Sequence, residues 1–236
     1  MKVRVILLSI TACLALGAET PVVRAPESIV ENYCAATRGQ DRMVQAASME
    51  IEIAAAIPNL KKQGKLHGLR RITALGRITY EMLKFEGDNT VKNQVINRYL
   101  AAEAEEQEEP GTAVAVTPEN YNFKYKGLKQ LDGRDVHEFQ VTPKRKLQGL
   151  FKGEIWIDVQ TFLRVQESGY LVKSPSIWVK KVSFVRKYEI RDGLSVPKEE
   201  QSVTDMRLGI GTVEMTVAFS NYAIDTRAVA GAPEIQ

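Results

Sequence analysis

The chain has 236 residues, of which 44% are hydrophobic and 26% are charged, and its formal net charge is +3. This composition is ordinary for a globular protein, and so small a net charge gives no global electrostatic reason to bind nucleic acid. The length is enough for one sizeable β domain or two small ones.

The N-terminal segment has the pattern of an export signal. Lys2 and Arg4 precede an apolar run over residues 5–16, and small residues follow up to Ala18. An apolar run of about twelve residues is too short to cross a bilayer as a helix, which needs about twenty. We therefore predict a signal peptide over residues 1–18 and an exported, periplasmic protein. A buried N-terminal strand or helix is the alternative.

Cys13 leaves a second processing route open. Residues 10–13, Ile-Thr-Ala-Cys, resemble a bacterial lipobox, in which the cysteine is lipidated and anchors the protein to a membrane. Against this route, the apolar run continues past Cys13 to residue 16. If Cys13 leaves with the signal, Cys34 has no disulfide partner and the hydrophobic core must hold the fold. We predict Cys34 to be a small buried residue on a helix, with a reactive thiol as the alternative.

A helix and three strands are predicted after a short linker. Pro26 suits the first turn of the helix and Gly39 its end. Alternation then predicts strands over residues 48–55, 66–73 and 77–85, the last two joined as a hairpin. The apolar stripe of the helix is Ile29, Val30, Tyr33 and Ala36.

A second helix of about fifteen residues is predicted after a capping sequence at residues 88–90. Its apolar face contains Val91, Val95, Tyr99 and Ala102. Glutamates over residues 103–109 crowd the negative end of the helix dipole, so we expect the helix to fray near residue 105. A solvated acidic loop follows.

From residue 112 onward nearly everything has the pattern of strand. The strand candidates are 121–125, 137–141, 147–157, 165–173, 176–191, 196–208 and 212–222. Residues 126–133 are expected to join the first two, and Gly149 and Gly153 to bend the third. The sixteen residues 176–191 would extend about 50 Å in a flat strand, which is too long for a domain of this size.

These elements predict an α+β fold. We expect a strongly curved antiparallel sheet of about ten strands, a half-barrel, with two main helices covering its concave face. Residues 19–225 would form a single domain and residues 226–236 a loose C-terminal tail. Two helices fill a wide concave face less completely than a second sheet does, so an apolar ligand cavity is expected between the sheet and the helices.

Several segments resemble a known family. They are residues 153–158 (Gly-Glu-Ile-Trp-Ile-Asp), 162–165, the return strand 180–190 with Asp192-Gly193, and residues 32–39. Together they resemble the LolA-like outer-membrane lipoprotein-sorting proteins over most of residues 26–225. The resemblance implies an incomplete β-barrel that holds a lipid or a lipoprotein acyl chain. It transfers no cargo-contacting residue to this chain.

The sequence offers little catalytic chemistry. His67 and His137 are 70 residues apart, and neither belongs to a metal-binding motif. Glu154 and Asp158 form a carboxylate pair on one strand, which without a cleft is weak evidence for acid–base catalysis. A nucleophile elbow, a phosphate-binding loop and a dinucleotide fingerprint are missing from the sequence. We therefore expect a non-enzymatic protein without metal or cofactor.

Basic residues of the predicted sheet allow two interpretations. They are Lys144, Arg145, Lys146, Lys152, Lys173, Lys180, Lys181, Arg186 and Lys187. They form either a rim that meets anionic headgroups or an acidic partner, or, the favoured interpretation, the solvated outer face of the sheet. Trp156 and Trp178 either line a pocket or, as we favour, pack in the core.

The function predicted from the sequence is that of an envelope carrier or binder of a lipid or lipoprotein acyl chain, monomeric, exchanging cargo with envelope donor and acceptor proteins. The helix around Val95 and Tyr99 would act as a lid. The alternative is an envelope protein-interaction module whose cavity is filled by its own side chains. The expected cavity lining is Ile51, Val95, Tyr99, Phe123, Phe139, Ile155, Val182, Phe184, Met215 and Val217.

Overall fold

The computed structural model describes residues 25–73, 77–106, 114–207 and 211–226. The expected signal peptide with Cys13, the turn of the first hairpin, most of the acidic loop and nearly all of the expected tail lie outside these ranges. Within them, no helix is both long and apolar enough to cross a bilayer.

Ten antiparallel strands form one sheet in the order β3-β2-β1-β10-β9-β8-β7-β6-β5-β4. The sheet is open, because β3 and β4 form its two edges. The first and last strands pair with each other inside the sheet, as the third and fourth strands of this order, for example at Ile53 and Val217. The strands are β1 (Val44–Ile57), β2 (Lys62–Ile72), β3 (Ile78–Gly87), β4 (Tyr121–Leu131), β5 (Arg134–Pro143), β6 (Phe151–Asp158), β7 (Arg164–Leu171), β8 (Val179–Arg191), β9 (Leu194–Met206) and β10 (Thr212–Thr226).

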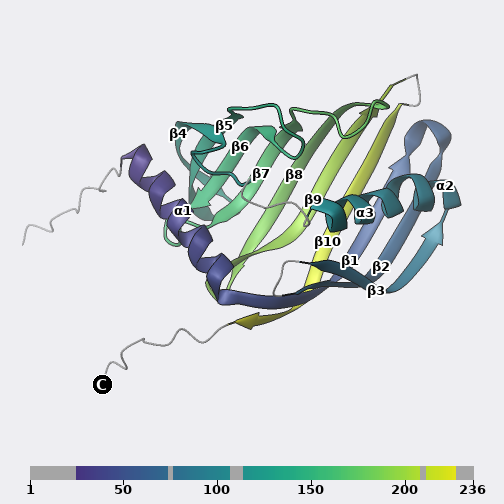
Figure 1. Cartoon of the computed structure of the whole chain (residues 1–236), viewed down its shortest axis with the longest axis horizontal. Coiled ribbons are helices and arrows are strands. Elements are labelled where there is room, and N and C mark those ends of the chain that lie inside the picture. Colours follow the sequence, from purple (N-terminus) through teal and green to yellow (C-terminus); the bar gives the residue numbers. More distant parts are fainter. Residues whose placement is uncertain (1–24, 74–76, 107–113, 208–210, 227–236) are drawn as a thin grey trace, which may run out of the picture.

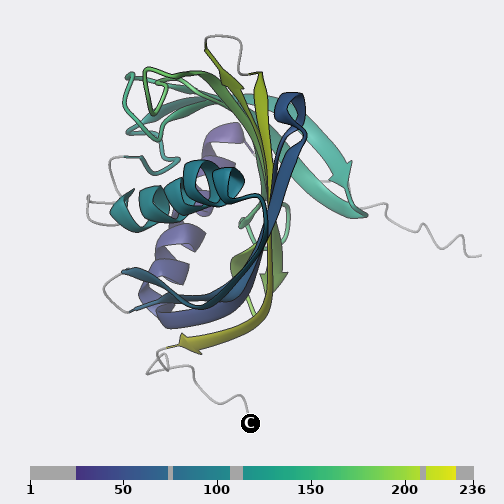
Figure 2. The same cartoon turned by 90° about the vertical axis from the view of Figure 1, so that its right-hand side faces the viewer.

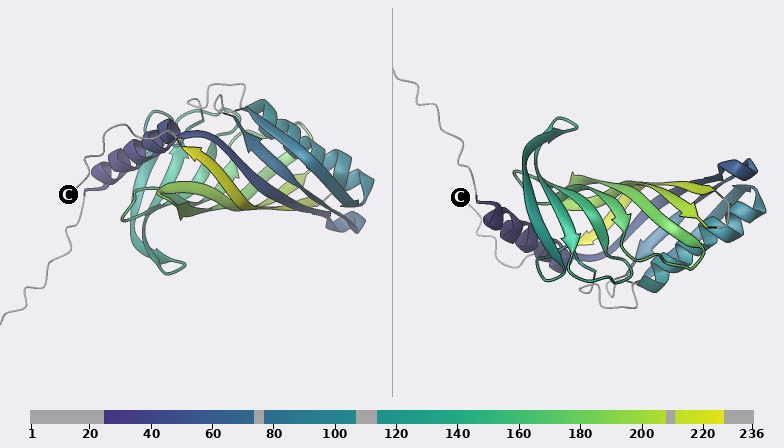
Figure 3. Two further views of the ribbon diagram at one scale, coloured as in Figure 1. Left: turned by 90° about the horizontal axis from the view of Figure 1, so that it is seen from below. Right: turned by 90° about the horizontal axis from the view of Figure 1, so that it is seen from above.

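The sheet is bent into a trough, and the helices lie on its concave side (Figures 1 and 2). Helix α1 (Pro26–Met43) crosses the trough near β4–β7, and the helix α2–α3, over residues 89–106, crosses it near β10, β1 and β2. Figure 3 shows the two helices at opposite ends of that side. The predicted α+β half-barrel is therefore confirmed.

Helix α1 begins at the predicted Pro26 but does not end at Gly39. It continues to Met43 and passes directly into β1, because Val44 already has extended dihedrals of φ −76° and ψ 118°. A left-handed closing glycine is needed only where the chain reverses, which explains the difference. The helix buries Cys34 as predicted, beside Ile29, Val30 and Tyr33.

The second helix is built from α2 (Asn89–Val91), a π-helical segment η2 (Lys92–Ile96) and α3 (Asn97–Glu106). The side chain of Asp88 accepts a hydrogen bond from the backbone N–H of Thr90, which confirms the predicted cap. The helix is described to Glu106, close to the expected end. Its π segment was not foreseen, because helical spacing alone does not distinguish the two hydrogen-bond patterns.

Several predicted boundaries in the second half were wrong. Strands β4 and β5 are joined by Asp132-Gly133 alone, and the predicted loop 126–133 is mostly strand. Gly127, with φ of 117°, absorbs a register shift there. Strand β8 begins at Val179, so residues 176–178 belong to the turn before it.

Gly153 allows β6 and β7 to approach closely. A β-carbon added at this residue would lie 1.8 Å from the carbonyl oxygen of Ser168, so no other residue fits without moving the neighbouring strand. Gly149 precedes β6 instead of interrupting it.

The buried side chains form two separate clusters. One lies under α1 and includes Tyr33, Phe139 and Ile155 from α1, β5 and β6. The other lies under α2–α3 and includes Ile53 and Leu100 from β1 and α3. The trough is therefore packed at both ends by its own helix.

Candidate functional site

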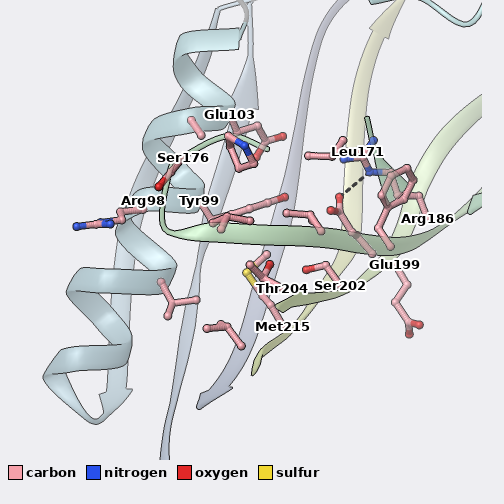
Figure 4. A pocket seen from close by; sticks show the side chains of 18 of the residues that line it. Arg98, Tyr99, Glu103, Leu171, Ser176, Arg186, Glu199, Ser202, Thr204 and Met215 are labelled. Carbon is pink, nitrogen blue, oxygen red and sulfur yellow. Dashed lines mark hydrogen bonds and ion pairs between the residues drawn. The ribbon is translucent and has the colours of Figure 1, made fainter. Parts of the chain in front are cut away.

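A cavity of about 570 Å³ lies between the two packed clusters. One wall is the helix, with Arg98, Tyr99 and Glu103, and the other is the concave face of the central strands, with Ser202 and Met215 (Figure 4). The turn between β7 and β8 borders the cavity. The volume of the cavity falls within the ~300–1,000 Å³ that small-molecule ligand pockets occupy.

The central strands leave this space because of the residues that face inward. Strand β9 directs Glu200, Ser202 and Thr204 toward the cavity, where β1 and β5 direct isoleucine, phenylalanine and valine into the core. Ser202 and Thr204 are small, so they fill less of the trough than those apolar side chains do. The walls are otherwise mainly apolar, from Val95, Ala102, Val179, Val182, Phe184, Met206, Val213, Met215 and Phe219.

The structure divides the ten residues expected to line a cavity into two groups. Those that border it are Val95, Tyr99, Val182, Phe184 and Met215. Those that do not are Ile51, Phe123, Phe139, Ile155 and Val217, which belong to or pack against the two clusters. Both groups occupy inward-facing positions. Residue parity identifies that face but not the part of it that a helix fills.

A partly buried ion pair attaches the helix to the sheet beside the cavity. Arg70 on β2 donates to Glu103 on α3 over 2.5 Å, and the hydroxyl of Tyr80 on β3 donates to the same carboxylate. Burial alone would lower the pKa of Arg70, but Glu103 raises it above its ordinary value, so the guanidinium stays charged. Burial also raises the pKa of Tyr99 on the same helix, and Glu200 and Glu103 raise it further.

A second polar cluster borders the cavity through Arg186 and Tyr188. Glu167 on β7 is buried and accepts hydrogen bonds from Arg164 at 2.5 Å, Arg186 at 3.2 Å and the Tyr188 hydroxyl at 3.1 Å. Arg186 also donates to Glu200 over 3.0 Å. Burial opposes ionisation of Glu167, but the two guanidinium groups hold its pKa below the usual value. Arg186 thus presents a paired cation to the cavity.

Apolar periodicity does not predict these charged and polar lining residues, because a charged residue at an inward position breaks that pattern. Arg186 stands out in the sequence only as a member of the basic group of the sheet. The signal was nevertheless present: Glu200, Ser202 and Thr204 recur at every second position of one strand. Such a row on the inner face of a sheet indicates a site that is not filled by core packing.

The two tryptophans differ in environment. Trp156 is partly buried on β6, whereas Trp178 is 51% exposed and borders the cavity. The preference for core packing was therefore wrong for Trp178. The favoured assignment of the basic residues to a solvated outer face was also wrong for Arg186, which lies in the second polar cluster and lines the cavity.

The described residues contain no group of three or more His, Cys, Asp and Glu side chains that could hold a metal ion. His137 contacts the hydroxyl of Tyr125 over 3.1 Å. Asp158 accepts hydrogen bonds from the backbone N–H groups of Gln160 and Thr161 and stabilises the turn after β6. Both residues therefore have structural partners.

No protein-family model matches the chain, and no curated protein matches it. Among solved structures it is similar to a DUF1329 family protein from Desulfovibrio piger, at 13% identity and TM-score 0.43 over 86% of this chain and 95% of that one. A putative outer membrane lipoprotein-sorting protein domain from Vibrio parahaemolyticus matches at 12% identity and TM-score 0.42, covering 88% and 95%.

A LolA superfamily protein from Nitrosomonas europaea matches at 12% identity and TM-score 0.35, covering 83% and 91% of the two chains. The chain is thus similar to solved LolA-superfamily and lipoprotein-sorting structures, as its sequence resemblance predicts.

Proposed function

We propose that this protein is a non-enzymatic carrier or binder of a lipid or lipoprotein acyl chain in the bacterial cell envelope. The observation that supports this most directly is the cavity of about 570 Å³ between the helix and the central strands. It lies on the concave face, has mainly apolar walls and borders the exposed turn before β8.

The energetics of such a site favour an acyl chain. Each methylene group transferred from water to an apolar wall contributes about 0.8 kcal/mol. That wall is formed by Val182, Phe184 and Met215. The acyl chain needs no covalent bond to stay bound. Loading is then driven by burial of the chain, and release by a partner that buries it better.

The charged residues suit a ligand with a polar end. Arg98 is exposed at the helix side of the cavity, and Arg186 borders the sheet side. A headgroup near these cations keeps its hydrogen bonds while the acyl chain enters the apolar part. The helix α2–α3 acts as the lid, held by Arg70 and Glu103.

The test combines extraction with a blocking substitution. Organic extraction of the exported protein should yield a co-purifying lipid by mass spectrometry, above a matched control protein. Thr204→Trp should fill the cavity and lower the affinity for a fluorescent fatty acid by about tenfold or more. Val203→Trp is the matched control, because Val203 is the adjacent β9 residue, 44% exposed and outside the cavity lining.

If no lipid is extracted and the protein binds no fatty acid, the carrier proposal is wrong. The alternative is then an envelope protein-interaction module with no lipid cargo. Equal loss of binding in Thr204→Trp and Val203→Trp would also count against the cavity as the site. Intact-mass measurement of the membrane fraction distinguishes cleavage after a signal peptide from lipidation at Cys13.

A further inference from the structure

The turn between β7 and β8 holds two large apolar side chains in water. Ile177 is 78% exposed and Trp178 is 51% exposed, and we name this pair the apolar tip. The neighbouring residues Pro175 and Ser176 are exposed as well. Trp178, Pro175 and Ser176 all line the cavity, so the apolar tip stands at its border.

The backbone of this turn is fixed by hydrogen bonds. The N–H of Trp178 donates to the Ser176 hydroxyl over 3.1 Å, and the N–H of Val179 donates to the Ser176 carbonyl over 3.1 Å. The N–H of Arg207 on the neighbouring chain segment donates to the Trp178 carbonyl over 2.8 Å. The turn therefore presents its apolar side chains in a defined conformation while remaining unburied.

Cations surround the apolar tip. Lys173, Lys180 and Lys181 are exposed on either side of it, and Arg207 is exposed beside it. The segment 172–181 contains no acidic residue. The nearest acidic position in register is Asp205, which lies opposite Lys181. The local charge is therefore positive, although the net charge of the chain is small.

We propose that the apolar tip docks this protein onto an anionic lipid membrane surface. Tryptophan prefers the boundary between headgroups and acyl chains, and lysines attract anionic headgroups while their stems reach across apolar surface. Two exposed side chains are too few for the core of a standard protein interface, which buries about 800 Å² on each partner. They suffice for a shallow membrane contact that is strengthened by charge.

The position of the tip gives docking a consequence, which rests on the proposed function. Because the turn borders the cavity, a membrane held at Trp178 lies next to the cavity border. An acyl chain then passes between bilayer and cavity with little exposure to water. Docking itself does not require that the cavity be loaded.

The experiment measures flotation with vesicles. It uses the exported chain carrying Cys13→Ser, so that no lipid anchor at that residue contributes. We expect binding to vesicles of phosphatidylglycerol and phosphatidylethanolamine, weakening as salt is raised, and much weaker binding to phosphatidylcholine vesicles. The double variant Ile177→Ser/Trp178→Ser should bind the anionic vesicles about tenfold or more weakly.

Two matched controls test the position of the effect. Met82→Ser/Leu128→Ser removes side chains that are 69% and 57% exposed on β3 and β4, and it should leave vesicle binding unchanged. Lys180→Gln and Lys181→Gln should each weaken binding about fivefold. Lys126→Gln and Lys129→Gln, exposed on β4, should have no such effect.

Failure to bind anionic vesicles, or equal binding of the wild type and the Ile177→Ser/Trp178→Ser variant, overturns the proposal. In that case an acidic protein is the better partner for the tip. Thr204→Trp separates this inference from the proposed function, since it should lower the affinity for a fluorescent fatty acid and leave vesicle binding intact. If Thr204→Trp also loses vesicle binding, docking depends on the cavity as well as on the tip, and the proposal that the tip alone docks the protein is wrong.

Discussion

The flanks of the trough and its middle follow different packing rules on one continuous sheet. Under α1, inward positions of β5 and β6 carry Phe139 and Ile155, whose exposed fractions are 1% and 0%. At the middle, β9 directs Ser202 and Thr204 inward, and a cavity of about 570 Å³ remains. A hollow can therefore be built into a half-barrel by side-chain size, without any change in strand pairing.

The polar groups show a related contrast. Where the flank meets the cavity, Glu167 is enclosed by Arg164, Arg186 and Tyr188 and accepts a hydrogen bond from each of them. Toward the middle, Arg98 is exposed beside the cavity. Paired charges fix the wall, while an exposed charge at the border is accessible to a ligand.

The largest effect should come from truncating the packed flank. Phe139→Ala should lower the free energy of unfolding by about 3–5 kcal/mol, because the side chain is 1% exposed and leaves a cavity that its neighbours cannot fill. Met215→Ala, at the middle, should lower it by only about 1 kcal/mol, because one side of Met215 already faces empty space. Urea denaturation of both variants measures the difference.

The informative result is the ratio of the two losses in the free energy of unfolding. Similar losses for Phe139→Ala and Met215→Ala would mean that the middle is packed as tightly as the flank. The cavity would then be closed in solution, and the contrast between the two regions would be lost.

The next effect should come from the buried carboxylate. Glu167→Gln should lower the free energy of unfolding by about 2–3 kcal/mol at neutral pH, because Arg164 and Arg186 lose their shared anion. The pKa of Glu167 is lowered in the folded state, so its contribution is fully present above the unfolded pKa of about 4.3 and is lost as the pH falls below that value.

Denaturation at several pH values checks this prediction. The difference in stability between wild type and Glu167→Gln should shrink from about pH 5 toward about pH 3. A difference that stays constant over that range would show that the carboxylate is not held in the charged form by its two arginines.

Much of this architecture could be predicted from alternation of apolar and polar residues. The antiparallel half-barrel, the cap at Asp88 and the burial of Cys34 follow from local patterns, and curvature follows from the length of residues 176–191. The pairing of β1 with β10 does not follow from them. Boundaries failed where tertiary contacts decide them. Helix α1 continues past Gly39 because it enters β1 without a reversal, which no local signal encodes.

The candidate site was predicted only in part, for a physical reason. Inward-facing residues share one parity, so Met215 at the cavity and Val217 in the core look alike in the sequence. Which of them meets empty space depends on where α2–α3 lies across the sheet, a long-range property. The polar residues of β9 were the local sign of the part of the sheet that lines the cavity. The exposed Trp178 shows that a large apolar residue need not lie in the core.

The smallest effect on stability should come from the lid side of the cavity. Val95→Asp places a charge on the face of the helix that borders the cavity, where Val95 is only partly buried. We expect the free energy of unfolding to fall by about 1 kcal/mol or less, since the carboxylate can reach water through the open middle. Affinity for a fluorescent fatty acid should fall by about tenfold or more, because an ion in an apolar site loses its hydration when the acyl chain enters.

Asn97→Asp is the control for this substitution, because it adds the same charge two residues along the helix at an exposed position outside the cavity lining. It should change neither stability nor fatty-acid affinity appreciably. If Val95→Asp instead lowers stability as much as it lowers binding, the helix surface at Val95 belongs to the packed flank. The helix at Val95 would then not form part of the ligand site, and any ligand would contact only the side of β8 and β9.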